Sequence, residues 1–171
     1  MNRWQDKYDF SQTQVDSDFA IIKAYFPKCI EVVKSDITDD KQGIDYLVRL
    51  EEGGEIFIDV KRREKGASKY WTHSEPELPL EVWSVVEKKK IGWTINGSLK
   101  THYVLYAFDK LDSEKVYMIP FQLLRKVFLE NGRIWAGKYG LKTQDSGQWH
   151  SQAIFVPASV VLLAISQIMS R

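Results

Sequence analysis

The sequence has a single cysteine and no long apolar run among its 171 residues. Because Cys29 has no second cysteine to pair with, the chain has no internal disulfide and no cysteine-based zinc cluster, which fits a reducing compartment. The longest apolar run, VVLLAI at 160–165, is far shorter than the roughly 20 residues of a membrane span. The charged start MNRWQDKYDF has no apolar stretch of a secretory signal. We therefore expect a soluble, cytoplasmic protein with no membrane partner.

The sequence also lacks an excess of charge of one sign. It has 24 Lys and Arg against 23 Asp and Glu, a formal net charge of +1. No global basic field indicates nucleic acid, so any such surface has to be local. No internal repeat, low-complexity tract or linker divides the chain. Its length and its 44% hydrophobic content predict a single domain over 1–171 with a real core.

Hydrophobic periodicity and turn signals predict the order of the elements. SQTQ at 11–14 matches a capping box, and apolar residues at helical spacing follow it as far as Pro27. Beyond this helix we expect strands near 29–34, 43–50, 55–62 and 78–87, a hairpin of 102–110 with 114–120, a helix over 121–131 closed by Asn131-Gly132, a long loop, and a C-terminal strand and helix over about 152–170. This order predicts an α/β fold in which helices flank a mixed central sheet.

The stretch GIDYLVRLEEGGEIFIDVKRRE at 43–64 places charged groups inside two strand-like runs. Burial of an ionised group is costly unless it is paired, bound to a metal or left at a solvated edge. A three-residue turn, Glu52-Gly53-Gly54 with Gly54 in the left-handed region, gives one register for the hairpin. It sets Asp45 opposite Lys61, Leu47 opposite Asp59 and Arg49 opposite Phe57.

In this register the apolar side chains share one face, and Asp45, Asp59 and Lys61 meet on the other. A two-residue Gly-Gly turn would instead move Asp59 and Lys61 onto the apolar face. Because a slip of one residue turns a whole set of side chains over, the hydrophobic pattern favours the three-residue turn. The register alone leaves two interpretations open: a functional site, or an ordinary cross-strand salt bridge between Asp45 and Lys61.

Asp45, the hairpin and the strand IFIDVK leading into Asp59-Val60-Lys61 together resemble the PD-(D/E)XK nuclease superfamily. The resemblance covers about 11–131 as architecture and 43–63 as motif. It implies an αβββαβ-type, restriction-endonuclease-like core and a metal-dependent phosphodiesterase site. The sequence departs from the motif at Gly43-Ile44, where a proline would precede the acid. PLEVWSVVEKKKIGW at 79–93 is also similar to phage- and plasmid-type members, in which an acidic strand precedes Gly-Trp.

The resemblance implies a role for each residue of the motif. Asp45, Asp59 and the Val60 carbonyl would hold Mg²⁺ or Mn²⁺, which prefer oxygen ligands and keep several waters. Lys61 would orient or deprotonate the attacking water, or stabilise the developing negative charge. Two further carboxylates, Asp18 on the first helix and Glu81 on the fourth strand, are candidates for the same site. The alternatives are a charge that complements the helix dipole, which suits Asp16 better, and an edge-strand charge.

Basic residues interleaved with aromatic ones suggest a surface for nucleic acid. They follow the triplet and precede a tryptophan: Arg62, Arg63, Lys65, Lys89 and Trp93. Solvated surface charge is the alternative interpretation. The three histidines lack metal-ligand spacing, so we expect ordinary packing for them.

The function expected from the sequence is a metal-dependent nuclease that hydrolyses DNA in preference to RNA. One alternative is a non-catalytic nucleic-acid- or protein-binding module on the same fold. Another is an α/β protein-interaction domain in which the acidic pair is an ordinary salt bridge. Whether the chain forms a homodimer stays open.

Overall fold

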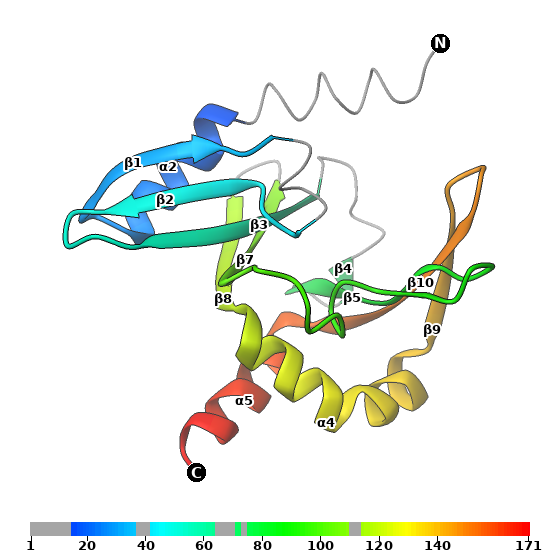
Figure 1. Ribbon diagram of the computed structural model, residues 1–171. Coiled ribbons are helices and arrows are strands. Elements are labelled where there is room, and N and C mark those ends of the chain that lie inside the picture. The colour runs from blue at the N-terminus through cyan, green and yellow to red at the C-terminus, as the bar shows by residue number, and fades with distance from the viewer. Residues whose placement is uncertain (1–14, 37–41, 64–70, 73–74, 110–113) are drawn as a thin grey trace.

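The computed structural model describes residues 15–36, 42–63, 71–72, 75–109 and 114–171, so the predicted capping box and Lys65 lie outside the described residues. The helices are α2 (Val15–Tyr25), α4 (Phe121–Tyr139) and α5 (Ala158–Met169). The strands are β1 (Cys29–Lys34), β2 (Tyr46–Leu50), β3 (Glu55–Arg63), β4 (Trp71–Thr72), β5 (Glu75–Val85), β6 (Lys90–Ile91), β7 (Tyr103–Asp109), β8 (Glu114–Pro120), β9 (Leu141–Asp145) and β10 (His150–Pro157) (Figure 1).

The described strands form two sheets, where the sequence predicted one. The first is mixed, in the order β1-β2-β3-β7-β8, with β3 and β7 parallel and the other neighbours antiparallel. The second is antiparallel, in the order β4-β5-β10-β9, with β6 on β5. The mixed α/β class is confirmed. The second sheet was missed because β10 pairs with β5 about seventy positions earlier, which local periodicity does not reveal.

The first sheet is covered on both faces, and this sets the depth of its central strand. On one face, Ile22 of α2 packs against Tyr46, Val48 and Ile58. On the other face, Val104, Tyr106 and Phe108 of β7 share a core with β5, β10, α4 and α5 (Figure 1). Residues 104–108 are therefore all buried, which explains why VLYAF is a continuous apolar run and not an alternating one. Within the described parts, no helix combines the length and apolarity needed to cross a membrane.

The prediction that a helix ends at Asn131-Gly132 is wrong, because α4 continues to Tyr139. Phe128 packs on Trp135, which is buried one heptad along on the same face, and their ring centroids lie 6.3 Å apart. The Asn131 side chain donates a hydrogen bond to the Val127 carbonyl inside the helix. Packing of the apolar face thus outweighs the weak helix propensity of Asn-Gly. The loop expected next contains β9, which pairs with β10.

The predicted turn type is confirmed in part, but the predicted register of the β2–β3 hairpin is wrong by two residues. Gly54 has the expected positive φ of 96°. However, Leu50 N–H donates to the Gly54 carbonyl, so the three turn residues are Glu51, Glu52 and Gly53. Leu47 therefore lies opposite Phe57, and Arg49 lies opposite Glu55. Because a shift of two residues preserves alternation, the apolar and charged sets keep their predicted faces.

Candidate active site

The two predicted metal-binding aspartates lie together at the end of the β2–β3 pairing. Asp45 directly precedes β2, its N–H donates to the Ile58 carbonyl (2.8 Å), and its Oδ2 accepts the Val60 N–H (2.6 Å). Asp59 lies mid-strand in β3 and is only 4% exposed. Burial, followed by the charge of Asp59, raises the pKa of Asp45 to about 6. The two carboxylates thus repel each other in a site that already disfavours charge.

The predicted position of Asp45 opposite Lys61 is wrong, because the register places Asp45 opposite Asp59. Lys61 instead pairs with Asp59 of its own strand. The Lys61 Nζ lies 2.6 Å from Asp59 Oδ1. Burial acts to lower the pKa of Lys61, but the carboxylates of Asp59, Asp45 and Glu81 outweigh burial and raise this pKa. The ammonium therefore stays charged. One ammonium against the Asp45–Asp59 pair leaves one negative charge uncompensated within this triad.

Glu81 and Trp93 reach the same place from the second sheet. The Lys61 Nζ lies over the Trp93 ring, 5.2 Å from its centroid. Glu81 Oε2 accepts hydrogen bonds from the Trp93 N–H (3.1 Å) and from Ser84 Oγ (2.7 Å). Glu81 is thus next to the cluster, as predicted. Trp93 is half-buried, and Lys61 lies over part of its ring, so its predicted contact with nucleic acid stays a prediction.

Asp18 and Arg62 lie on the opposite face of the sheet, so the structure does not bring them to the cluster. Arg62 Nη2 lies 2.6 Å from Asp18 Oδ1, and both side chains are more than nine-tenths buried. The Tyr46 hydroxyl donates to Asp18 Oδ2 (2.9 Å), and burial followed by the Asp18 charge raises the pKa of Tyr46. Asp18 is therefore an internal partner of Arg62 and Tyr46. The predicted contact of Arg62 with nucleic acid is wrong for the same reason.

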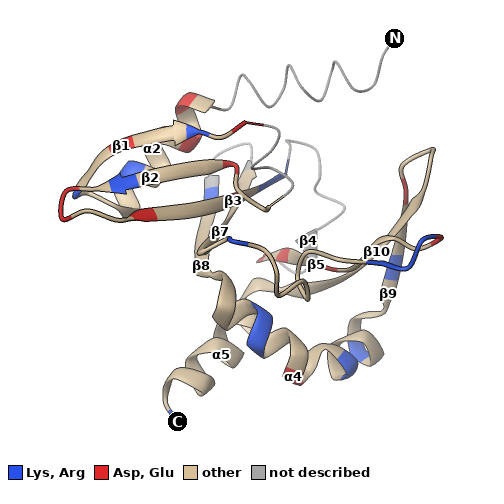
Figure 2. Cartoon of the chain, in the orientation of Figure 1, with Lys and Arg blue, Asp and Glu red and all other residues tan. Residues whose placement is uncertain are grey.

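The other two basic candidates within the described residues, Arg63 and Lys89, lie in different parts of the structure. Arg63 is two residues beyond Lys61 in β3, so alternation places it on the face of the cluster. Lys89 is exposed in the turn between β5 and β6, where its φ is +50°. Figure 2 shows this basic turn at the far end of the second sheet. The turn adjoins the start of β10, since Val86 N–H donates to the His150 carbonyl.

Phe57 and His102 form an aromatic pair on the cluster's face that sequence reasoning missed. Their rings are stacked, with centroids 5.0 Å apart and 8° between the planes. His102 Nδ1 accepts the Phe57 N–H (2.9 Å), which places the ring proton on Nε2. His102 is exposed and directly precedes β7, where its N–H donates to the Phe57 carbonyl (2.9 Å). The signal available in the sequence was the position of Phe57, two residues before Asp59 on the same side of β3.

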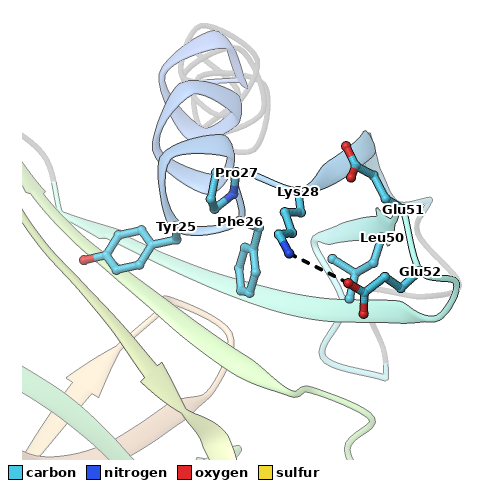
Figure 3. A pocket seen from close by; sticks show the side chains of 7 residues that line it. All are labelled: Tyr25, Phe26, Pro27, Lys28, Leu50, Glu51 and Glu52. Atoms are coloured by element: carbon cyan, nitrogen blue, oxygen red, sulfur yellow. Dashed lines mark ion pairs between the residues drawn. The ribbon is translucent and has the colours of Figure 1, made fainter.

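A pocket of about 390 Å³ lies elsewhere, between the end of α2 and the β2–β3 turn (Figure 3). Tyr25, Phe26 and Leu50 supply its apolar lining, and the Lys28–Glu52 ion pair crosses it at 3.8 Å. Asp45 is at the other end of β2, which is about 20 Å away along the strand. The pocket is therefore separate from the acidic cluster.

The cluster's donor set fits a hard divalent cation. Within the described ranges, no group of three or more His, Cys, Asp and Glu side chains is arranged to hold a metal. Mg²⁺ is commonly held by only one or two carboxylates and keeps several waters. Asp45 and Asp59 meet that need, and the Val60 carbonyl points to the same side of β3 as its N–H, which donates to Asp45. A divalent cation would also compensate the residual negative charge.

Comparison of the chain with protein-family models, with curated proteins and with solved structures gives no match.

Proposed function

We propose that this chain is a divalent-metal-dependent nuclease of the PD-(D/E)XK type, which hydrolyses phosphodiester bonds in DNA in preference to RNA. The observation that carries the proposal is the arrangement of Asp45, Asp59 and Lys61. Two carboxylates repel each other at a largely buried position, and one ammonium lies 2.6 Å from the second of them. Such an arrangement disfavours folding, and functional sites are where proteins tolerate it.

The Asp18–Arg62 pair shows what a structural ion pair looks like in the same sheet. There, one carboxylate meets one guanidinium, and the Tyr46 hydroxyl binds the second carboxylate oxygen. The charges balance. The triad of Asp45, Asp59 and Lys61 has two carboxylates and one ammonium, so its charges do not balance among themselves. This difference favours a metal site over the ordinary salt bridge that the sequence left open.

The order of the first elements supports the proposal. A helix, α2, precedes three antiparallel strands, β1 to β3, and β7 then adds in parallel beside β3. This resembles the first part of an αβββαβ core. The resemblance is incomplete, because the described residues of the crossover from β3 to β7 form β4, β5 and β6 and no helix, whereas that core has a helix there.

The metal ligands and Lys61 have separate roles in the proposed reaction. Mg²⁺ or Mn²⁺, held by Asp45, Asp59 and the Val60 carbonyl, would supply Lewis-acid stabilisation of the phosphoryl oxygens and a more acidic water. Lys61 has three N–H donors, so it can bind Asp59 and a phosphate oxygen together. Its charged state suits the stabilisation of developing negative charge better than the removal of a proton from water.

The exposed His102 end of this face is the proposed approach of the substrate. At the Lys61 end, the face is covered by Trp93 and the fully buried Tyr106. At the other end, His102 is exposed and stacked on Phe57. A nucleobase can stack on the exposed His102 ring, and its Nε2–H can donate to a phosphate.

The test is a cleavage assay on single-stranded, duplex, nicked and branched DNA and on RNA, with Mg²⁺, Mn²⁺ or EDTA. Wild type is compared with Asp59→Asn, which keeps the shape of the carboxylate but removes its charge. Asp16→Asn is the matched control, since Asp16 is exposed in the first turn of α2. We expect metal-dependent cleavage by wild type and by Asp16→Asn and none by Asp59→Asn.

Other outcomes would assign the protein differently. Binding of nucleic acid without cleavage under any metal would make the chain a non-catalytic module. Cleavage that survives Asp59→Asn would place the active site elsewhere. Preference for RNA over DNA would overturn the proposed substrate and leave the proposed chemistry intact.

A further inference from the structure

The Lys61 side chain bridges the two sheets. Its Nζ lies 2.6 Å from Asp59 Oδ1 in the first sheet and 5.2 Å from the centroid of the Trp93 ring, which follows β6 of the second. A lysine has four rotatable side-chain bonds, and an ammonium held at only one point samples many rotamers. Here an anion and an aromatic face hold it together. The face of an indole ring is the aromatic surface that attracts a cation best.

The Trp93 ring is itself fixed by packing. Its centroid lies 6.3 Å from the ring centroid of Tyr106 and 6.4 Å from that of Phe121. Tyr106 and Phe121 are both fully buried. The ring therefore has a rigid backing on the side of the core and presents its remaining surface to Lys61.

The Trp93 backbone is fixed by β5. Glu81 Oε2 accepts the Trp93 N–H (3.1 Å), and Gly92 N–H donates to the Val82 carbonyl (2.7 Å). A Cβ on Gly92 would lie only 2.3 Å from the backbone oxygen of Glu81, so only glycine allows this approach. This requirement gives the Gly92-Trp93 sequence a physical reason: the glycine admits the turn against β5, and the tryptophan then reaches the lysine.

We propose that Trp93 is a positioning residue that holds the Lys61 ammonium beside Asp59, and that Glu81 acts on the site through Trp93 and not as a metal ligand. The catalytic part of this inference rests on the proposed nuclease function. The contact itself does not, and it can be tested without any cleavage assay.

The first test detects the contact by ¹⁹F NMR of protein labelled with 5-fluorotryptophan. The Trp93 resonance is the one that disappears in Trp93→Phe. We expect Lys61→Met to shift this resonance, because the cation over the ring is removed. Lys100→Met is the control, since Lys100 is exposed in the segment between β6 and β7, and it should leave the resonance in place. An unchanged Trp93 resonance in Lys61→Met would overturn the inference, whatever the cleavage assay gives.

The second test separates positioning from substrate stacking and from plain packing. Cation–π attraction falls from Trp to Tyr and Phe and is absent for Leu. We expect kcat to fall in that order, by about tenfold for Trp93→Leu, with partial rescue in Trp93→Phe and no change in KM. Trp149→Leu, on half-buried Trp149 of the turn between β9 and β10, is the control and should leave kcat unchanged. A rise in KM at constant kcat would overturn positioning in favour of base stacking.

The third test concerns Glu81. Glu81→Gln keeps an oxygen acceptor for the Trp93 N–H and removes the charge, whereas Glu81→Ala removes both. Asp59 and Asp45 act on Lys61 more strongly than Glu81 does, so Lys61 stays charged in Glu81→Gln. We expect Mn²⁺ affinity and kcat to be close to wild type in Glu81→Gln, and kcat to fall in Glu81→Ala as it does in Trp93→Leu. A loss of Mn²⁺ affinity in Glu81→Gln would overturn the inference and make Glu81 a ligand. If the ¹⁹F contact is present but wild type cleaves nothing, the proposed nuclease function fails and the positioning of Lys61 stands.

Discussion

Asp45 and Asp59 face each other one step beyond the last β2–β3 pair, Tyr46 with Ile58. Burial, the charge of Asp59 and a side-chain hydrogen bond to it raise the pKa of Asp45 from 3.8 to about 6, although Lys61 and the Val60 N–H act to lower it. A carboxyl group in this state is easier to protonate in the folded chain than in the unfolded chain. This relationship gives the metal-free protein a testable pH dependence.

The first prediction concerns the stability of the metal-free protein. Because the folded pKa of Asp45 lies above the unfolded value, its contribution to the free energy of unfolding is fully present below about pH 4 and is lost as the pH rises through 6. An asparagine at this position does not ionise, so the Asp45→Asn variant does not lose this part of its stability. In EDTA we expect Asp45→Asn to be more stable than wild type at pH 7.5, by at most about 3 kcal/mol, and this advantage to vanish at pH 4. Urea denaturation of both proteins across this pH range measures the difference. A destabilisation independent of pH would indicate an ordinary favourable ion pair.

The second prediction separates the metal ligand from the cation beside it. Asp59→Asn removes an anionic ligand, so Mn²⁺ binding and cleavage should be lost together. Lys61→Met keeps the aliphatic stem and removes a positive charge near the metal, so Mn²⁺ affinity should stay the same or rise. The cleavage rate should nevertheless fall by about a hundredfold or more, as loss of one transition-state donor does. Calorimetric Mn²⁺ titration beside the cleavage assay tests both. Equal loss of metal affinity in the two variants would contradict these separate roles.

The third prediction uses the buried pair on the opposite face as a structural control. Arg62→Met leaves the Asp18 carboxylate buried without its guanidinium, so we expect the free energy of unfolding to fall by about 3–5 kcal/mol. Mn²⁺ affinity of the folded protein should not change, because Arg62 does not face the acidic cluster. Denaturant unfolding and calorimetry at a temperature where the variant is folded measure the two effects. A large change in metal affinity would mean that the two faces are coupled.

The fourth prediction concerns the aromatic pair. His102→Ala removes an exposed stacking surface and a donor, so we expect single-stranded DNA to bind about 5- to 100-fold more weakly. The metal affinity should be unchanged. Tyr25→Ala is the control, since Tyr25 is also an exposed aromatic residue but lies at the separate pocket. Fluorescence anisotropy with labelled DNA measures both. Equal binding by His102→Ala and wild type would remove the pair from the substrate path.

The fifth prediction concerns Arg63, the basic residue that follows Lys61 on the same face of β3. If Arg63 contacts a phosphate, Arg63→Gln should weaken binding across DNA sequences and lower the slope of log K against log salt by about one unit. Lys28→Gln is the control, because Lys28 lies at the separate pocket with Glu52. Binding titrations between 50 and 200 mM salt, about the range over which such contacts weaken, compare the two. An unchanged slope in Arg63→Gln would mean that Arg63 contacts no phosphate and has a structural role only.

Several features followed from the sequence because their causes are local. Proline at 120 and 157 predicted where α4 and α5 begin, since proline suits the start of a helix and not its interior. The alternation of apolar residues in 43–50 and 55–62 predicted which face of the hairpin is apolar. The same alternation put Asp45, Asp59 and Lys61 on one face, because a strand turns every second side chain to the same side.

The exact register of the hairpin depended on more than this alternation. Gly53 and Gly54 both have positive φ, and both are glycine. The sequence therefore does not indicate which of them is the last residue of the turn. The observed register puts Arg49 between Glu31 of β1 and Glu55 of β3. The third strand therefore completes an ion pair that the hairpin alone does not contain. Glu51 N–H also donates to the Lys28 carbonyl, which ties the turn to the start of β1.

Tertiary structure also decided which charged residues belong to the site. From the sequence, Asp18 was a candidate acid of the site and Arg62 a candidate phosphate contact. In the structure they pair with each other on the face of the sheet that α2 covers. Glu81, Trp93 and His102 lie 20, 32 and 41 residues beyond Lys61 in the sequence. Sequence periodicity reports which side of its own strand a residue faces. Packing of the second sheet against β7 brings Glu81 and Trp93 to Lys61, and the parallel pairing of β7 with β3 brings His102 to Phe57.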